Sequence, residues 1–145
     1  LIIFGGDDVS DVKRAIEVAL AEVERTFGDV YANDAGHLEL QYTARASHAV
    51  NAAFGAPEGK AFGLIVGAPA AIGVVMADVA VKSANVDVIG YASPSAGTSN
   101  SNEVILQISG DSGAVRQAVI SAREVGKQLL STMGDEPVNG APSYI

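Results

Sequence analysis

The sequence VILQISGD (residues 104–111) is an apolar run that ends in a Gly-Asp pair and leads into an amphipathic segment over residues 113–130. Apolar or small residues recur at helical spacing in that segment, at Val115, Ala118, Val119, Ala122, Val125, Gly126 and Leu129. The pattern predicts a short strand, a turn and a helix with one apolar face. This strand-turn-helix unit is the strongest organisational signal in the sequence, because the chain contains it twice.

The same unit stands at the start of the chain, where LIIFGGDD (residues 1–8) leads into a predicted helix over residues 9–27. Its apolar positions repeat the spacing of the later helix, at Val9, Val12, Ile16, Ala19, Leu20, Val23 and Phe27. The offset between the two units is constant, 111 − 8 = 103 residues from Asp8 to Asp111. That offset is too long for a solenoid and fits a tandem duplication of a domain of roughly 100 residues.

The duplication predicts how the chain is divided. We expect residues 1–29 to be the last strand and helix of a first domain, residues 30–134 to be a second domain, and residues 135–145 to be a tail. The apolar start at Leu1 further predicts that the chain begins inside a strand and that the preceding part of the first domain is missing.

Between the two units the sequence predicts further strands and helices. Period-two alternation or a short apolar run predicts strands over residues 37–42, 62–68, 87–92 and 104–108. Helices are predicted over residues 45–54, with Ala46, Ala49, Val50 and Ala53 inward, and over 69–84, with Ile72, Val75, Met76, Val79 and Ala80 inward. Helices placed between strands predict an α/β (α+β) fold in which one sheet is covered by helices.

Composition and charge narrow the classes of function. The formal net charge is −8 at pH 7 and the pI is about 4.5, which opposes binding to nucleic acid or to an anionic membrane surface. The chain has no cysteine, so disulfides, thiolate nucleophiles and cysteine-ligated metals are excluded for it. No apolar run reaches the ~18–20 residues that span a bilayer, and we expect residence in the cytosol.

No group of residues predicts catalysis, a metal site or a cofactor. Gly110-Asp111-Ser112-Gly113 matches the run around a serine protease nucleophile, but a protease also needs a His and an Asp within hydrogen-bond reach. His37 and His48 are the only imidazoles, and their spacing is not that of a helical ligand pair. Gly5-Gly6-Asp7-Asp8 lacks the lysine of a phosphate-binding loop. We therefore expect that the protein is not an enzyme.

Short polar residues before the two repeated helices predict how these helices begin. Asp8 or Ser10 stands at the start of the first helix, and Asp111 or Ser112 at the start of the second. Such side chains accept hydrogen bonds from the free N–H groups of a first helical turn. We expect Asp8 and Asp111 to be helix caps.

A family resemblance rests on residues 62–91. Phe62-Gly63-Leu64-Ile65-Val66-Gly67, then Asp78-Val79-Ala80-Val81-Lys82-Ser83-Ala84-Asn85-Val86 and Val88-Ile89-Gly90-Tyr91, are similar to a strand, a helix and the next strand of bacterial microcompartment (BMC) shell domains. Gly110-Asp111-Ser112-Gly113-Ala114-Val115 is similar to the start of their following helix. The strand and short helix that end the usual domain here precede it, so the order resembles the circularly permuted tandem shell proteins. Segments 27–33, 41–46 and 142–145 resemble the propanediol-utilisation type in particular.

The resemblance implies a permuted BMC domain, with a mostly antiparallel sheet flanked by helices, in a tandem-domain chain that forms pseudohexagonal trimers. It implies a structural tile with pores in the shell of a cytoplasmic microcompartment. The implied partners are two further copies in a homotrimer, other shell proteins at the tile edges, encapsulated enzymes and a small polyol permeant. A metabolite-sensing α/β binding domain without a shell role remains the alternative.

The resemblance also gives roles to residues near the end of the predicted helix 69–84. Asp78, Lys82 and Asn85 would lie at the edge where tiles meet, with Lys82 donating to backbone carbonyls of the neighbouring tile. The alternative is a solvated helix C-terminus, where a lysine also suits the helix dipole.

The loop over residues 93–102 has no charged side chain and many hydroxyl and amide groups, at Ser93, Ser95, Thr98, Ser99, Asn100, Ser101 and Asn102. These residues either form a flexible surface loop or line a pore. Hydroxyls and amides exchange hydrogen bonds with small alcohols at little net cost. Such a pore would pass 1,2-propanediol or glycerol and slow an aldehyde intermediate, which only accepts hydrogen bonds.

Overall fold

The computed structural model describes residues 2–26, 29–95, 102–140 and 145. Its elements are α1 Val9–Thr26, β1 Asp29–Asn33, β2 Gly36–Thr43, α2 His48–Phe54, β3 Ala61–Ala68, α3 Ala70–Ser83, β4 Asp87–Ala92, β5 Val104–Gly110, α4 Ser112–Ser131 and β6 Val138–Asn139. No helix in this described part is long and apolar enough to cross a membrane.

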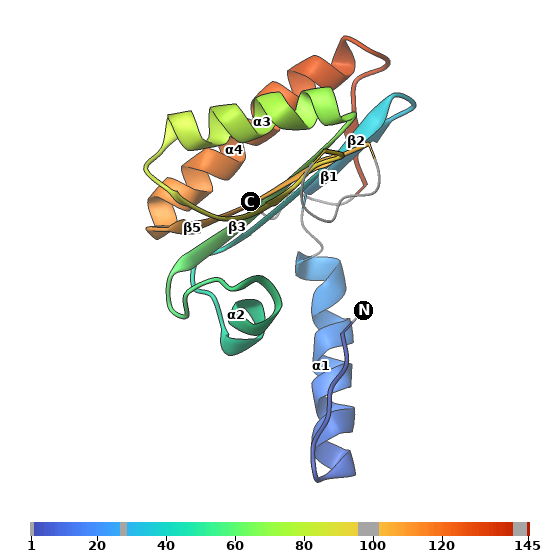
Figure 1. Ribbon diagram of the computed structural model, residues 1–145. Helices are drawn as coiled ribbons and strands as arrows, with labels where there is room; N and C mark the ends of the chain where they lie inside the picture. Colours follow the sequence, from blue (N-terminus) through green and yellow to red (C-terminus); the bar gives the residue numbers. More distant parts are fainter. Residues whose placement is uncertain (1, 27–28, 96–101, 141–144) are drawn as a thin grey trace.

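A single six-stranded sheet organises the molecule. Its strand order is β4-β5-β3-β2-β1-β6, and every neighbouring pair is antiparallel. Figure 1 shows α3 and α4 lying together over one face of this sheet, while α2 lies beyond the other face at one end. The α/β (α+β) fold with a mostly antiparallel sheet flanked by helices, expected from the sequence, is confirmed.

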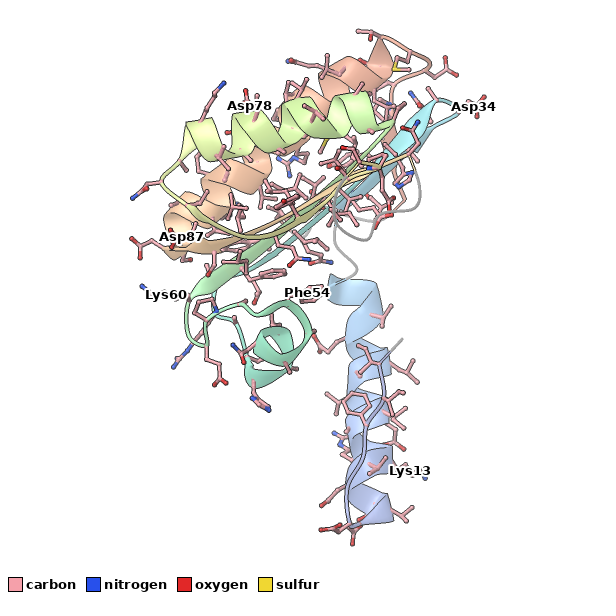
Figure 2. The ribbon with its side chains drawn as sticks, viewed as in Figure 1. Lys13, Asp34, Phe54, Lys60, Asp78 and Asp87 are labelled. Carbon is pink, nitrogen blue, oxygen red and sulfur yellow. The ribbon has the colours of Figure 1, made fainter. Side chains whose placement is uncertain are left out.

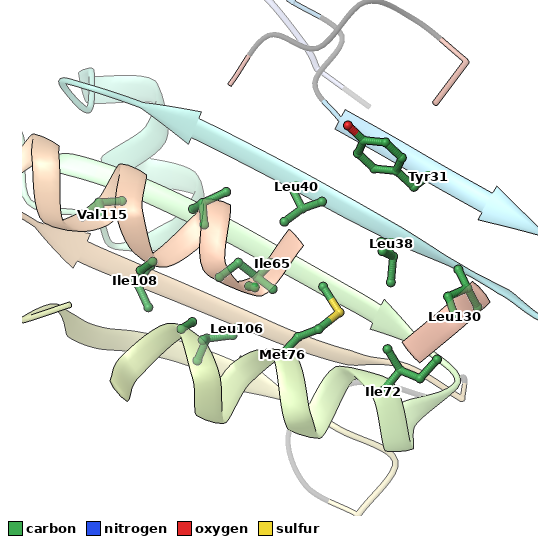
Figure 3. Packing of buried hydrophobic residues seen from close by; sticks show 14 of the residues in the cluster. Tyr31, Leu38, Leu40, Ile65, Ile72, Met76, Leu106, Ile108, Val115 and Leu130 are labelled. Carbon is green, nitrogen blue, oxygen red and sulfur yellow. The ribbon is translucent and has the colours of Figure 1, made fainter. Parts of the chain in front are cut away.

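The main core fills the space between the sheet and the two helices α3 and α4 (Figure 3). Side chains from every layer are fully buried there, among them Leu38, Ile65, Met76, Ile108 and Val119. Periodicity predicted most of the apolar face of α4. Val115, Ala118, Val119, Ala122 and Gly126 are buried as expected, whereas Val125 and Leu129 are only partly buried and Leu130, which was not predicted, is buried.

Glycines let the helix α3 approach the sheet unusually closely. A Cβ on Gly73 of α3 would lie 2.5 Å from the backbone oxygen of Gly67 in β3, and one on Gly67 would lie 2.6 Å from the Gly73 Cα. A Cβ on Gly126 of α4 would meet the Met76 sulfur at 2.7 Å. Since real Cβ atoms do not approach other atoms so closely, the three glycines set the spacing of these layers.

A smaller apolar cluster lies on the other side of the sheet, between the sheet and α2. It consists of the buried residues Ala46, Ala56 and Phe62, with Val50, Leu64 and Ile89 packed against them. The ring of Phe54 stacks on that of Phe62 with 5.1 Å between centroids. This cluster fixes the short helix and its flanking turns to one end of the sheet.

Some predicted elements were wrong in part. The predicted strand at the start of the chain is absent from the described residues 2–8, where no strand pairs with this segment. The predicted helix 45–54 begins only at His48 and buries none of its own residues; Ala46 is buried before it. Val75 was expected to face inward but is 39% exposed. Apolar residues occur on every side of α3, so the sequence pattern did not single out its inner face.

Two strands were not predicted. β1 forms a hairpin with β2 and pairs with β6 on its other side, through Tyr31 and Asn139 and through Ala32 and Val138. The side chain of Asp29, at the start of β1, is fully buried and accepts a hydrogen bond from Arg123 of α4 at 3.0 Å. Burial alone would lower the pKa of the Arg123 guanidinium, but its hydrogen bonds to Glu124 and Asp29 outweigh burial and raise that pKa.

The helix α1 stands apart from the sheet and its covering helices (Figure 1). Its predicted apolar face is largely exposed, with Ile16 43%, Leu20 67% and Val23 49% accessible. The equivalent face of α4 is buried, because it packs on β2 and β3. The same sequence pattern therefore packs on a sheet in one unit, whereas in the other only the short segment of residues 2–6 lies along it (Figure 1).

Candidate functional site

The outer face of α3 brings together the charged residues predicted to lie at a tile edge. Lys82 Nζ donates to Asp78 Oδ2 at 2.6 Å, one helical turn away, and both side chains are more than half exposed. Figure 2 shows Asp78 on the side of α3 that faces away from the sheet. Asn85 follows the helix and is also exposed. The three side chains are therefore accessible to another molecule.

Apolar side chains flank this ion pair. Val74, Val75 and Val81 are 58%, 39% and 38% exposed. Positions three and four apart share one face of a helix, so Val74, Val75, Asp78, Val81 and Lys82 form a single stripe along α3. A helix that is apolar on nearly all sides is usually covered by other protein on all sides. Because the outer side of α3 carries exposed valines beside its ion pair, this stripe is suited to contact with another protein surface.

The predicted pore loop is described only at its two ends. Ser93 Oγ lies 3.4 Å from Ser95 Oγ, with Ser93 half-buried and Ser95 exposed. At the other end, Asn102 Oδ1 accepts a hydrogen bond at 3.2 Å from the backbone N–H of Ala70, in the first turn of α3. The remaining predicted lining residues, Thr98, Ser99, Asn100 and Ser101, lie outside the described residues.

Beside that anchored end lies a polar group that the sequence did not predict. The imidazole Nε2 of His37 in β2 lies 3.5 Å from Glu39 Oε1 and 3.7 Å from Glu103 Oε2. Ala35, His37, Ala68, Pro69, Asn102 and Glu103 line a small cavity of about 210 Å³. Only the pairing of β2 with β3, and of β3 with β5, brings His37 and Glu103 together, so no local sequence signal could have revealed them.

The two predicted helix caps differ in the structure. Asp8 Oδ1 accepts from the Ser10 backbone N–H at 2.7 Å and from the Ser10 hydroxyl, which are the hydrogen bonds that a cap of α1 makes. These two hydrogen bonds, with one from the Asp11 amide, lower the pKa of Asp8 below its ordinary value. Asp111 is the N-cap residue of α4, but its side chain makes no cap hydrogen bond, so the expected side-chain cap does not form.

The alternative cap of α4, Ser112, has a different partner. It is the first residue of the helix, and its Oγ lies 2.6 Å from the Tyr42 hydroxyl in β2. His48, one of the two imidazoles, lies against Glu58 at 3.2 Å. The Gly-Asp-Ser-Gly run thus ties a helix to the sheet, and no group of three metal-ligating side chains forms within the described ranges.

The family is shown by sequence. Residues 61–136, from β3 through α4, match the model of the BMC domain. The chain belongs to the BMC domain family.

Its relatives are named shell proteins. The chain is 72% identical over all 145 residues to the bacterial microcompartment shell protein PduB of Citrobacter freundii, and it covers 54% of that protein. It is 63% identical to PduB of Limosilactobacillus reuteri, of which it covers 61%. The chain thus spans a little over half the length of these relatives. The predicted likeness to PduB is confirmed.

Solved structures agree with these relatives. The crystal structure of a trimeric bacterial microcompartment shell protein PduB matches with a TM-score of 0.91 and 62% identity, over 97% of this chain and 62% of that one. EtuB from Clostridium kluyveri matches with the same TM-score and 48% identity, over the same shares. EutL from Clostridium perfringens, 22% identical with a TM-score of 0.76, shares the fold.

Proposed function

We propose that the chain is part of a structural shell protein of a bacterial microcompartment, a tile of the PduB type located in a shell within the cytoplasm. The observation that carries this proposal is the identity of 72% over the whole chain to a microcompartment shell protein. The exposed stripe on α3 supports it, because a tile needs an accessible edge.

The division of the chain into two domains is part of the proposal. We infer that residues 1–29 end a first BMC domain, that residues 30–134 form a second, permuted one, and that residues 135–145 are a tail. The repeat supports this division, since Val12 and Ile16 match Val115 and Val119, which are fully buried in the second unit. The exposed face of α1 would then pack on a sheet of the first domain, as α4 packs on its own sheet.

In this proposal the protein forms a homotrimer whose six domains make a pseudohexagonal tile. The stripe on α3 faces another shell protein at the tile edge, where Lys82 leaves Asp78 to donate to backbone carbonyls of the neighbour. The exposed ion pair stabilises the protein by only about 0–1 kcal/mol, so Lys82 loses little free energy when it leaves Asp78 for the carbonyls of the neighbour. Encapsulated enzymes would contact the inner side of the shell.

The loop over residues 93–102 would line a pore for a small polyol such as 1,2-propanediol or glycerol, while an aldehyde intermediate is retained. Its hydroxyl and amide groups can replace the water around such a molecule. The hydrogen bond from Ala70 to Asn102 supports this role, because it fixes one end of the loop to a rigid helix.

Assembly of the full-length protein tests the shell role. We expect wild-type protein to form trimers that associate into sheets at high concentration, and Lys82→Glu to keep the trimer but lose the sheets. Lys60→Glu is the matched control, since it changes the charge equally at an exposed turn before β3. Size-exclusion chromatography and electron microscopy give the two readouts. Sheets that persist in Lys82→Glu would contradict the edge role.

A further inference from the structure

An Asn-Gly pair lies at the end of β6, the edge strand of the sheet. Asn139 is the only asparagine in the chain that is followed by glycine. An Asn-Gly pair is the sequence most prone to cyclisation, because glycine has no side chain to hinder the approach of its own nitrogen. We propose that Asn139 deamidates in the folded protein and that the isoaspartate formed there opens the outer edge of the sheet.

The local structure leaves this pair accessible. Asn139 is half-buried in β6, a strand of two residues at the edge of the sheet, and Gly140 is exposed just after it. A Cβ placed on Gly140 would have no atom within 4 Å. The open space around Gly140 therefore leaves room for its nitrogen, the attacking atom, to move toward the side chain of Asn139.

A backbone donor is already placed at the oxygen on which charge develops. The Val30 N–H donates to Asn139 Oδ1 at 3.3 Å. When a nucleophile attacks the side-chain amide, negative charge accumulates on this oxygen in the tetrahedral intermediate. A donor held there beforehand stabilises that charge, as in an oxyanion hole.

The reaction needs only water. The Gly140 nitrogen loses its proton to solvent and bonds to Cγ of Asn139, the bond from Cγ to Nδ2 breaks, and Nδ2 leaves as ammonia. Water then opens the resulting succinimide at one of its two carbonyls. Opening at Cγ gives aspartate, and opening at the main-chain carbonyl gives isoaspartate.

The two products affect the sheet differently. Aspartate keeps the backbone and an oxygen that can accept from Val30. Isoaspartate inserts a methylene after the Asn139 Cα and turns the former main-chain carbonyl into a free carboxylate. The last residue of β6 thus loses its normal backbone carbonyl, in a strand whose pairing consists of Tyr31 with Asn139 and Ala32 with Val138. Either product adds a negative charge beside the segment that holds the buried Asp29 carboxylate. β6 is therefore expected to detach from β1 as isoaspartate accumulates.

Ageing of the full-length protein in warm, mildly alkaline buffer tests this inference, with Gly140→Ala and Asn139→Gln as variants. Alanine fits the open space at Gly140 but hinders cyclisation, so loss of folding does not confuse the comparison. Peptide mass spectrometry measures conversion at each asparagine, and an isoaspartate-specific methyltransferase labels the rearranged product. Hydrogen exchange of the Tyr31 and Ala32 amides follows the edge of the sheet.

We expect Asn139 to convert severalfold faster in wild type than in Gly140→Ala, and before Asn33, Asn51 or Asn85. Exchange at the edge amides should rise with the isoaspartate fraction and stay constant in both variants. Equal rates in wild type and Gly140→Ala, or earlier conversion of another asparagine, would overturn the modification site. Conversion without faster exchange would overturn the opening of the edge.

Discussion

The side-chain amide of Asn33 donates a hydrogen bond to the backbone oxygen of Leu130, 3.1 Å away at the end of α4. The same amide nitrogen donates to Asp135 O at 2.7 Å, and Oδ1 accepts from the backbone N–H groups of Ala35 and Gly36. One side chain thus joins the β1–β2 turn, the last turn of α4 and the chain that leads to β6.

Asn33→Asp should destabilise the protein more than its change in size suggests. A carboxylate cannot donate, so the carbonyls of Leu130 and Asp135 would face negative charge. We expect a loss of about 2–3 kcal/mol in the free energy of unfolding, measured by urea denaturation of the full-length protein. Asp34→Asn, at the neighbouring exposed position, is the control and should change stability little. An Asn33→Asp variant as stable as this control would contradict the role of the side chain as a donor.

Gly73 and Gly113 lie in two helices but have opposite surroundings. Gly73→Ala would place a methyl group against the backbone of Gly67, so we expect a loss of about 1–3 kcal/mol in thermal or urea unfolding. A methyl group on Gly113 would meet no atom within 4 Å, so Gly113→Ala should leave stability unchanged or raise it slightly. Equal effects of the two substitutions on stability would show that the close packing of α3 on β3 does not exclude a side chain at residue 73.

The buried ion pair between Asp29 and Arg123 should be sensitive to loss of one partner. Arg123→Met leaves a fully buried carboxylate without its guanidinium, and we expect destabilisation of about 3 kcal/mol. The double variant Asp29→Asn with Arg123→Met should recover much of this loss, because no unpaired charge remains. A double-mutant cycle in urea measures the coupling, and strictly additive losses would rule it out.

The cap of α1 predicts a pH dependence in the acid range. Its hydrogen bonds lower the pKa of Asp8 below the ordinary value of 3.8, so the cap stabilises α1 fully above that pH. This contribution is lost as the pH falls below 3.8 and through the lower pKa of the folded state. Carboxyl NMR titration should give a folded pKa for Asp8 below 3.8, and Asp8→Asn should remove the corresponding change in α1 helicity. A pKa at or above 3.8 would contradict the cap.

Passage of small polyols tests the proposed pore. Replacing Ser95, Ser99 and Asn100 together by alanine removes hydrogen-bonding groups without adding bulk. We expect slower entry of glycerol into assembled shells or vesicles that carry the full-length protein, measured by a coupled enzyme inside. The control is Ser131→Ala, which removes a hydroxyl at an exposed position at the end of α4, far from the loop in sequence. This control should leave glycerol entry unchanged. Unchanged glycerol entry in the triple variant would exclude these side chains as the lining.

Sequence periodicity identified helices that have one apolar face and strands in which apolar and polar residues alternate. It failed for segments whose apolar residues do not distinguish one face from another. The inner face of α4 was predicted correctly because its outer face is polar. The orientation of α3 was predicted only in part, since valines such as Val75 stand on its outer side too. β6 has two residues and β1 has five, and such short strands gave no periodic signal; β6 also depends on a partner distant in the sequence.

The candidate site shows the same division. The family resemblance singled out Asp78 and Lys82, and their ion pair on one face of α3 follows from their spacing, because residues four apart are neighbours on a helix. The choice between Asp111 and Ser112 as a cap could not be made from sequence, since both have suitable side chains at suitable positions. In the structure Asp111 holds the N-cap position without a side-chain hydrogen bond, and Ser112 contacts Tyr42, an arrangement that depends on how α4 sits on β2.

The pairing of β1 with β6 has a consequence for how the protein folds during synthesis. Tyr31 and Asn139 are 139 − 31 = 108 residues apart, so β1 leaves the ribosome long before its outer neighbour exists. Closing so long a loop is entropically costly and slow compared with the β1–β2 hairpin, which forms locally. The nascent chain therefore carries an open sheet edge at β1 until residues 138–139 have emerged, and only their pairing shields this edge from neighbouring chains.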